Sequence, residues 1–141
     1  MRGEGGGADT VSDSGWKLFG ERIVKAKQIL DEASTLPTKC PEWYVDMLLI
    51  AQNQSWEVAD ARALFEQADK FEPGYYYYAR VFAVYLFPQW SGQKGDTEQF
   101  TKEIADRIGG DQGDILYFQV ASSEYVICGC DDGPRMSWER I

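Results

Sequence analysis

The sequence contains no histidine, and this absence excludes several kinds of site at once. Histidine is the commonest general base near neutral pH, a frequent metal ligand and a member of the usual nucleophile triads. The chain also lacks any GxSxG, P-loop, GxGxxG or HExxH stretch, the short motifs that mark catalytic or nucleotide-binding geometry. Carboxylates are abundant, but no pattern pairs them on a shared inward face. We therefore expect a protein that is not an enzyme and needs no cofactor.

Cations and long apolar runs are also scarce. Lys and Arg number 14 against 23 Asp and Glu, which gives a formal net charge of -9 and repels polyphosphate. No run approaches the roughly eighteen apolar residues of a membrane span, and the N-terminus lacks the basic segment and apolar core of a signal peptide. These absences predict no nucleic-acid partner, no membrane insertion and a cytoplasmic location, with export through a removed signal as the alternative.

Cysteine is rare, because the chain has only Cys40, Cys128 and Cys130. An odd number, two of them too close together to bridge, argues against a disulfide framework and for a reducing compartment. In the stretch CGCDDG, Cys128, Cys130, Asp131 and Asp132 are residue types that ligate soft or borderline metals. Structural zinc sites usually need a second ligand pair, so an ordinary polar turn is the preferred interpretation and a metal site the alternative.

Apolar residues make up 44% and aromatic residues 14% of the 141 residues. A chain of this length buries roughly two thirds of its unfolded surface, so it can form a core without disulfides or metals. The glycine-rich start, MRGEGGGADT, favours a flexible N-terminus over residues 1–11. Residues 12–127 are then expected to form one helical domain, and residues 128–141 a turn followed by the start of a further helix.

Apolar side chains recur at gaps of three and four residues, the spacing of one helical face. The first helix is expected to have Asp13 or Ser14 as its cap and to stop at Leu36-Pro37. No hairpin signal or convincing strand appears, and short connections imply antiparallel neighbours. Its apolar face comprises Trp16, Phe19, Ile23, Ala26, Leu30 and Ala33.

Five further helices are predicted from the same spacing and from turn and capping residues. All lie between short stretches rich in proline, glycine or polar residues. Their expected boundaries are Pro41 to the QNQS stretch, Ser55 as a cap to Pro73-Gly74, Tyr75 to Phe87, Asp96 with Gln99 as a capping box to Gly109-Gly110, and Asp114 as a cap to Ile127.

A small-large-small pattern recurs in the chain after thirty-five residues, close to the roughly 34-residue period of tetratricopeptide repeats. Small residues let neighbouring helices approach, and the large residue fills the space between them. The two sets are Ala26, Leu30 and Ala33, and then Ala61, Phe65 and Ala68, which Pro73 follows.

The segment from Ala61 to Pro73 resembles the second helix of a tetratricopeptide repeat. The same register starts a repeat near Tyr76 and puts Ala83 where the family has a small residue, whereas Leu49 departs from that pattern. The resemblance implies an all-α fold of antiparallel helical hairpins stacked as a short right-handed α-α superhelix.

The chain is also similar to a bacterial family of domains of unknown function, related to tetratricopeptide and Sel1-like repeats. The similarity is carried by three blocks in order: GWKLF from Gly15, PEWYVDMLLIAQNQSW from Pro41, and LFEQADKFEPGYYYYARVFAVYLFPQWSGQKGD from Leu64. Ser91 stands where a glycine is expected, which affects the shape of that loop. This resemblance implies a helical-repeat module without an assigned activity.

Tetratricopeptide-like arrays bind peptides on the concave face of their first helices. The resemblance therefore implies a non-catalytic scaffold for a protein or peptide partner. The alternatives are a small-ligand-binding or enzyme-associated domain that uses acidic and tyrosine residues, a purely structural segment of a longer array, and, for each aromatic residue, a role in the core. The partner-binding residues implied are Trp43, Asp46, Ile50, Asn53, Tyr77, Arg80, Val84 and Phe87.

Four consecutive tyrosines open one of the expected first helices. Successive helical residues point to every side of a helix, so the four cannot all be buried. We expect Tyr78 to point inward and Tyr77 toward the groove. Tyr75 and Tyr76 lie in the first turn, where their hydroxyls can reach water.

Overall fold

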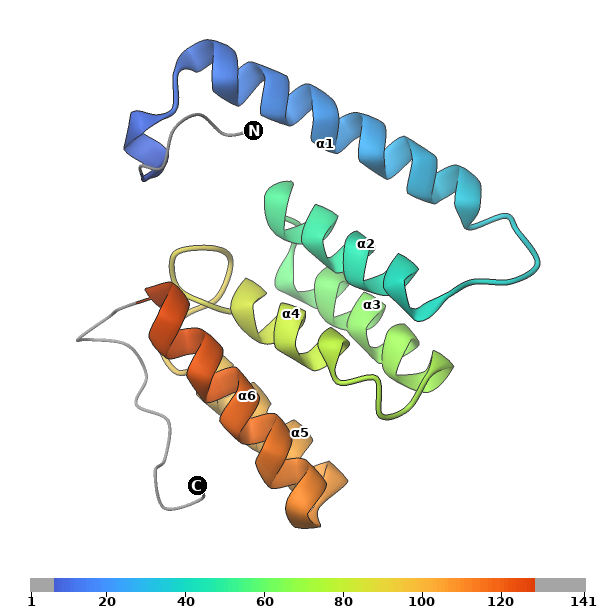
Figure 1. The fold of residues 1–141 in the computed structure, drawn as a ribbon, viewed down its shortest axis with the longest axis vertical. Coiled ribbons are helices and arrows are strands. Elements are labelled where there is room, and N and C mark those ends of the chain that lie inside the picture. Colours follow the sequence, from blue (N-terminus) through green and yellow to red (C-terminus); the bar gives the residue numbers. More distant parts are fainter. Residues whose placement is uncertain (1–6, 129–141) are drawn as a thin grey trace. The chain divides into compact units, whose positions relative to one another are not determined.

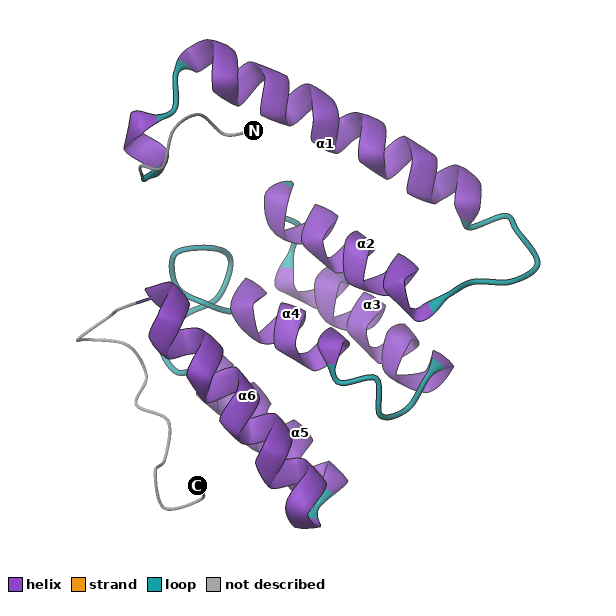
Figure 2. Ribbon diagram, viewed as in Figure 1, coloured by secondary structure: helices purple, strands orange, loops and turns teal. Residues whose placement is uncertain are grey.

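The computed structural model describes residues 7–128, which form six α-helices, one short 3-10 helix and no strand (Figure 2). The all-α prediction is confirmed for this part of the chain. The chain divides into two compact units, residues 1–39 and 40–141, and each is described by itself. None of the helices between residues 7 and 128 has the length and apolar character of a membrane span.

The first unit contains the 3-10 helix η1 (Ala8–Thr10) and α1 (Asp13–Ala33). Ser12 is the N-cap of α1, and its hydroxyl accepts a hydrogen bond from a backbone amide of the first turn, 3.2 Å away. The predicted caps, Asp13 and Ser14, are wrong because both residues already lie in the first turn. No residue of α1 is fully buried.

The second unit is built around one central helix. That helix, α4, contacts all four other helices of the unit, and the remaining contacts join α2 to α3 and α5 to α6. Figure 1 shows the order of the helices along the chain. Their bounds are α2 (Pro41–Asn53), α3 (Val58–Phe71), α4 (Tyr77–Tyr85), α5 (Asp96–Ile108) and α6 (Gly110–Cys128).

Ser55 ends α2 and does not cap α3, which corrects the sequence prediction. Its φ of 51° is left-handed, and the next amide, of Trp56, donates to the carbonyl of Ala51 at 3.0 Å. This is the Schellman arrangement, in which a left-handed residue closes a helix end. The connection is held further by the hydroxyl of Tyr85, which donates to the carbonyl of Trp56. The N-cap of α3 is Glu57, without a side-chain hydrogen bond.

The turn between α3 and α4 forms where Pro73 and Gly74 predict it. Gly74 has a φ of 89°, and the amide of Tyr75 donates to the carbonyl of Glu72 at 3.2 Å. Proline followed by a left-handed glycine is the pattern of a type II turn. The helix that follows, α4, is shorter by two residues at each end than the predicted range of 75–87.

The start of α5 is predicted correctly, but the proposed capping box is wrong. The N-cap is Gly95, with a φ of 96° and no side-chain cap. Asp96 instead accepts a hydrogen bond from the amide of Gln93 at 2.8 Å, on the loop side of the helix start. Because the carboxylate of Asp96 faces the loop, it does not pair with Gln99 in a capping box.

The reversal between α5 and α6 uses the predicted glycine pair, since Gly109 and Gly110 have φ values of 71° and 54°. The prediction of Asp114 as a cap is wrong, because α6 already begins at Gly110. The two helices approach closely in this first part of α6. A Cβ atom added to Gly113 would lie 2.3 Å from the carbonyl oxygen of Ala105 in α5.

Three phenylalanines from three helices form the centre of the second unit. Phe65 of α3 stacks on Phe82 of α4 with ring centroids 5.3 Å apart, and Phe100 of α5 meets both rings edge-on at 5.1 and 4.9 Å. Such aromatic pairs contribute about 0.5–1.5 kcal/mol each beyond their buried area. Ala61 and Ala68, the small residues flanking Phe65, have no exposed surface, so they are packing positions.

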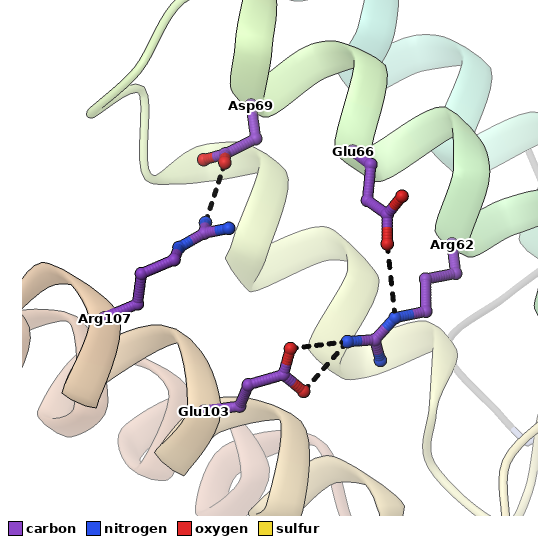
Figure 3. A network of polar contacts seen from close by, with 5 residues as sticks. All are labelled: Arg62, Glu66, Asp69, Glu103 and Arg107. Carbon is purple, nitrogen blue, oxygen red and sulfur yellow. Dashed lines mark hydrogen bonds and ion pairs between the residues drawn. The ribbon is translucent and has the colours of Figure 1, made fainter.

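Ion pairs join α3 to α5 on the surface (Figure 3). Arg62 donates to both carboxylate oxygens of Glu103 at 2.7 and 2.8 Å, and its Nε lies 3.6 Å from Glu66. Arg107 donates to Asp69 at 2.7 Å. Because these side chains are substantially exposed, each pair contributes only about 0–1 kcal/mol. The arginines of this surface therefore have carboxylate partners from within the chain.

Candidate functional site

A groove crosses three helices of the second unit, with α4 in contact with both α2 and α6. Its cavity has a volume of about 270 Å³. The lining is mainly aliphatic and aromatic, with one guanidinium, one amide and one aliphatic hydroxyl among its polar groups. The lining residues are Leu49, Gln52, Tyr77, Arg80, Val81, Val84, Ser123 and Ile127.

Three of the eight predicted partner-binding residues line this groove: Tyr77, Arg80 and Val84. Tyr77 is 54% exposed and lies where the sequence predicts it. Two predicted residues, Ile50 and Phe87, are 4% and 1% exposed, so they are packing residues and are wrong as surface contacts. The other three, Trp43, Asp46 and Asn53, do not line the groove.

Helix geometry explains why the sequence missed Leu49, Gln52 and Val81. Equivalent positions in two repeats point in the same direction from their own helices. A groove between two helices is instead lined by the facing edges of the pair, which carry different repeat positions. No sequence signal identifies Leu49, because its 41% exposure on a largely buried helix depends on how that helix packs.

Arg80 is the distinctive group of the groove. Its guanidinium lies over the ring of Tyr77, 5.2 Å from the ring centroid, and its Nε is buried without a hydrogen-bond partner. Among the side chains that the structure describes, Arg80 makes no ion pair, whereas Arg62 and Arg107 each have a carboxylate partner. A cation–π contact stabilises the charge, but it gives the Nε–H group no acceptor.

The predicted residues outside the groove make local contacts. The amide of Asn53 donates to the carbonyl of Leu49 at 2.7 Å, and the ring of Trp43 meets that of Tyr44 edge-on at 4.9 Å. Partial burial raises the pKa of Asp46, and the nearby charge of Glu42 raises it further. The hydrogen bond of Asn53 thus lies within α2 itself.

The tyrosines at the start of α4 divide as their spacing predicts. Tyr78 points inward and is 2% exposed, and burial raises the pKa of its hydroxyl to about 12. Tyr75 donates to the carboxylate of Glu42 at 2.8 Å, which raises the pKa of Tyr75. Tyr76 donates to the side-chain oxygen of Gln112 at 3.4 Å. Tyr75 and Tyr76 precede α4, so their predicted place in its first turn is wrong, and both hydroxyls have protein partners.

A second cavity, of about 340 Å³, lies beside the turn between α3 and α4 and reaches α5. Its walls include Tyr75, Tyr76 and Tyr78, and its charged residues are Asp69 and Arg107. Those two side chains form an ion pair with each other, 2.7 Å apart. The charges of this cavity are thus matched internally, unlike the charge of Arg80 in the groove.

The metal alternative falls on Cys128, Cys130, Asp131 and Asp132. The last three lie outside the described residues, as does the side chain of Cys128. Among the residues that the structure describes, no group of three or more Cys, Asp or Glu side chains is arranged to hold a metal ion.

No protein-family model matches the chain, and no match was found among curated proteins or among solved structures. The tetratricopeptide and Sel1-like resemblance therefore stays a prediction that rests on the sequence pattern.

Proposed function

We propose that α2 to α6 form part of a short, right-handed, tetratricopeptide-like stack that binds a protein or peptide partner on the face of α2, α4 and α6. The order of helix contacts supports this arrangement, because α4 contacts α2 and α6, the helices two places away along the chain. The complete burial of Ala61 and Ala68 also fits the small-residue positions of such a repeat.

The groove is the main observation that supports the proposal. It combines an exposed aromatic ring, Tyr77, with aliphatic walls that include Leu49 and Val84. Its arginine, Arg80, has no carboxylate partner among the side chains that the structure describes. Tyrosine and arginine are enriched among the residues that dominate binding energy at protein interfaces. An amphipathic segment of a partner would bury its apolar side against these walls.

The lining favours binding over catalysis. Ser123 is the one serine that lines the groove, and its hydroxyl donates to the backbone carbonyl of Gln119 at 2.9 Å. Among the described residues that line the groove, none has a carboxylate or thiol that could act as a base or nucleophile. We therefore assign the groove a scaffold role.

A small-ligand function is the second candidate, and the cavity beside the α3–α4 turn favours it. Its volume of about 340 Å³ falls within the range of small-molecule sites. Tyr78, which lines it, carries a buried hydroxyl without a hydrogen-bond partner among the described residues. The groove is the preferred binding site because its unsatisfied donor belongs to Arg80, whose guanidinium carries a full charge.

Selection of peptides from a random display library on the immobilised chain tests the proposal. Peptides that bind are then measured against Tyr77→Ala and against Phe118→Ala, an equally exposed aromatic outside the groove. Loss of an interface aromatic anchor costs roughly 2 kcal/mol, about thirtyfold in affinity. We expect that loss for Tyr77→Ala alone. Equal affinities for both variants, or no selected peptide at all, would refute binding at this face.

A further inference from the structure

We propose that the groove recognises a segment of a partner that places a carboxylate beside an aliphatic side chain, and that Arg80 is the receptor for the carboxylate. This inference rests on the proposed function and specifies its partner. The carboxylate comes either from an Asp or Glu side chain or from a chain terminus, because both present the same two oxygens to a guanidinium.

The partners of the arginines in the second unit are the first support for this inference. Arg62 and Arg107 lie on α3 and α5, and their carboxylate partners are 2.7 Å away. Arg80 lies on α4 and has no carboxylate partner among the described side chains, although the chain has nine more acidic than basic residues. In so acidic a chain, an arginine without an intramolecular carboxylate is available to one from outside.

The buried Nε of Arg80 is the second observation that supports carboxylate binding. A buried donor without an acceptor costs about 1–3 kcal/mol, more when it is charged, so native structures rarely leave one unsatisfied. The ring of Tyr77 covers the guanidinium at 5.2 Å, which restricts the orientation of its plane. Because Nε itself is buried, the carboxylate would meet the two terminal nitrogens, whose paired N–H groups match its two oxygens.

The aliphatic walls of the groove support the third part of the inference, that an aliphatic side chain accompanies the carboxylate. Leu49, Val81, Val84 and Ile127 lie in the same cavity as Arg80, and its volume is about 270 Å³. That space suits one aliphatic side chain of a partner next to the charged group. Filling it would exclude water from the guanidinium and strengthen the ionic hydrogen bonds by lowering the local dielectric.

The net charge of -9 makes this recognition short-range. An acidic segment meets repulsion from the chain as a whole at distances beyond the groove. Salt screens that long-range repulsion more than it weakens a contact inside the groove. We therefore expect moderate salt to accelerate association of an acidic peptide, the reverse of ordinary ion-pair steering.

Three small probes and nitrogen-15 NMR of the arginine Nε–H groups test the inference. The probes are N-acetyl-leucine, with a terminal carboxylate; N-acetyl-leucyl-aspartic acid amide, with a side-chain carboxylate; and N-acetyl-leucinamide, with none. Arg80→Gln assigns the Arg80 resonance. Arg62→Gln is the matched control, because it removes the same charge from an arginine that already has a partner.

We expect the Arg80 resonance to shift with a carboxylate probe and to remain in place with N-acetyl-leucinamide. Arg80→Gln should weaken carboxylate binding about tenfold or more, as the loss of a charge-assisted hydrogen bond requires, while Arg62→Gln leaves it unchanged. The tighter of the two carboxylate probes identifies the source. Arg80→Lys keeps the charge without the fork and should bind at an intermediate level.

Three results would overturn the inference, and they differ in what they mean for the proposed function. Equal binding of N-acetyl-leucine and N-acetyl-leucinamide would show an apolar groove that ignores the carboxylate, so the partner-binding proposal would stand alone. No response of the groove to any probe would count against both proposals. Equal losses in Arg80→Gln and Arg62→Gln would assign the effect to general charge.

Discussion

The hydroxyl of Thr97, in the first turn of α5, donates a hydrogen bond to the carbonyl oxygen of Ala83 in α4, 3.1 Å away. The last four carbonyls of a helix lack amide partners four residues on, and the amide of Phe87 bonds to Val84 instead of Ala83. Thr97 is completely buried, so water cannot take its place. The side chain of Thr97, at the start of α5, thus supplies the hydrogen bond to a carbonyl at the end of α4.

Replacing Thr97 with valine keeps the shape of the side chain and removes this hydrogen bond. We expect the free energy of unfolding to fall by about 1–3 kcal/mol, because the carbonyl stays buried without a partner. Urea denaturation measures the change. Thr101→Val is the control, since the hydroxyl of Thr101 bonds only one turn back, to the carbonyl of Thr97 at 2.6 Å. Losses of the same size in both variants would contradict this account.

Gly113→Ala tests the close approach of α5 and α6. The added Cβ would lie 2.3 Å from the backbone oxygen of Ala105, so the helices must separate. Overpacking of this kind costs about 1–3 kcal/mol, and we expect a lower midpoint of thermal unfolding. Gly20→Ala, where the Cβ meets nothing within 4 Å, should be neutral or more stable because alanine favours helix. A tolerated Gly113→Ala would argue against the helix spacing.

Ala61→Leu tests the small-residue position predicted from the repeat. Ala61 has no exposed surface, so the larger side chain should destabilise the second unit by about 1–3 kcal/mol. Ala63→Leu, on the exposed side of the same helix, should change the unfolding free energy by less than about 0.5 kcal/mol. Chemical denaturation of the two variants compares them directly. The repeat register fails if Ala61→Leu is as stable as Ala63→Leu.

Ser55→Gly is expected to stabilise the chain. Ser55 has a φ of 51°, a left-handed conformation that costs a residue with a Cβ about 1–2 kcal/mol. Glycine removes that cost but loses more entropy on folding, so a net gain of about 0.5–1 kcal/mol is expected. The comparison with Ser55→Ala, which keeps the Cβ, isolates the backbone effect. A less stable Ser55→Gly variant would mean that the serine side chain matters more than its conformation.

Tyr78 makes stability depend on alkaline pH. Burial raises its pKa from 10.0 to about 12, so the unfolded chain releases this proton at a lower pH than the folded chain. Between about pH 10 and 12 the unfolded state binds fewer protons, and stability must fall as pH rises. The stability that this pKa shift contributes is complete below about pH 10 and lost above about pH 12.

The variant Tyr78→Phe should remove this part of the pH dependence. It also deletes a hydroxyl without a hydrogen-bond partner, so at neutral pH the variant should be as stable as the parent or slightly more so. Denaturation midpoints across the alkaline range, for both proteins, measure the effect. Parallel curves for the two proteins would show that Tyr78 is not the group responsible.

Helical periodicity was enough to predict the number and approximate place of the helices. It places α2 at Pro41 and α5 at Asp96, where the structure has them, because proline and acidic residues favour a first turn. Caps were less predictable. Ser55 has the right side chain for an N-cap, but its backbone is left-handed because it closes α2. Side-chain type cannot distinguish these two uses of a serine.

The candidate site was predictable in part for a similar reason. Tyr77, Arg80 and Val84 share one face of α4, so a helical register groups them correctly. The contribution of Leu49 depends on which edge of α2 meets α4, and this is a matter of packing between helices. The sequence distinguishes Arg80 from Arg62 only in part. Glu66, four residues after Arg62, is a partner that helical spacing predicts, whereas the contact of Arg62 with Glu103 depends on the packing of α3 and α5.

The helix contacts of the second unit also bear on how quickly it folds. Each pair of helices in substantial contact is adjacent along the chain or separated by a single helix. Folding rates rise as contacts become more local in sequence, because less loop-closure entropy is lost before contacts form. Any one hairpin can therefore form early and serve as a template for its neighbours, and we expect this unit to refold on the millisecond timescale or faster.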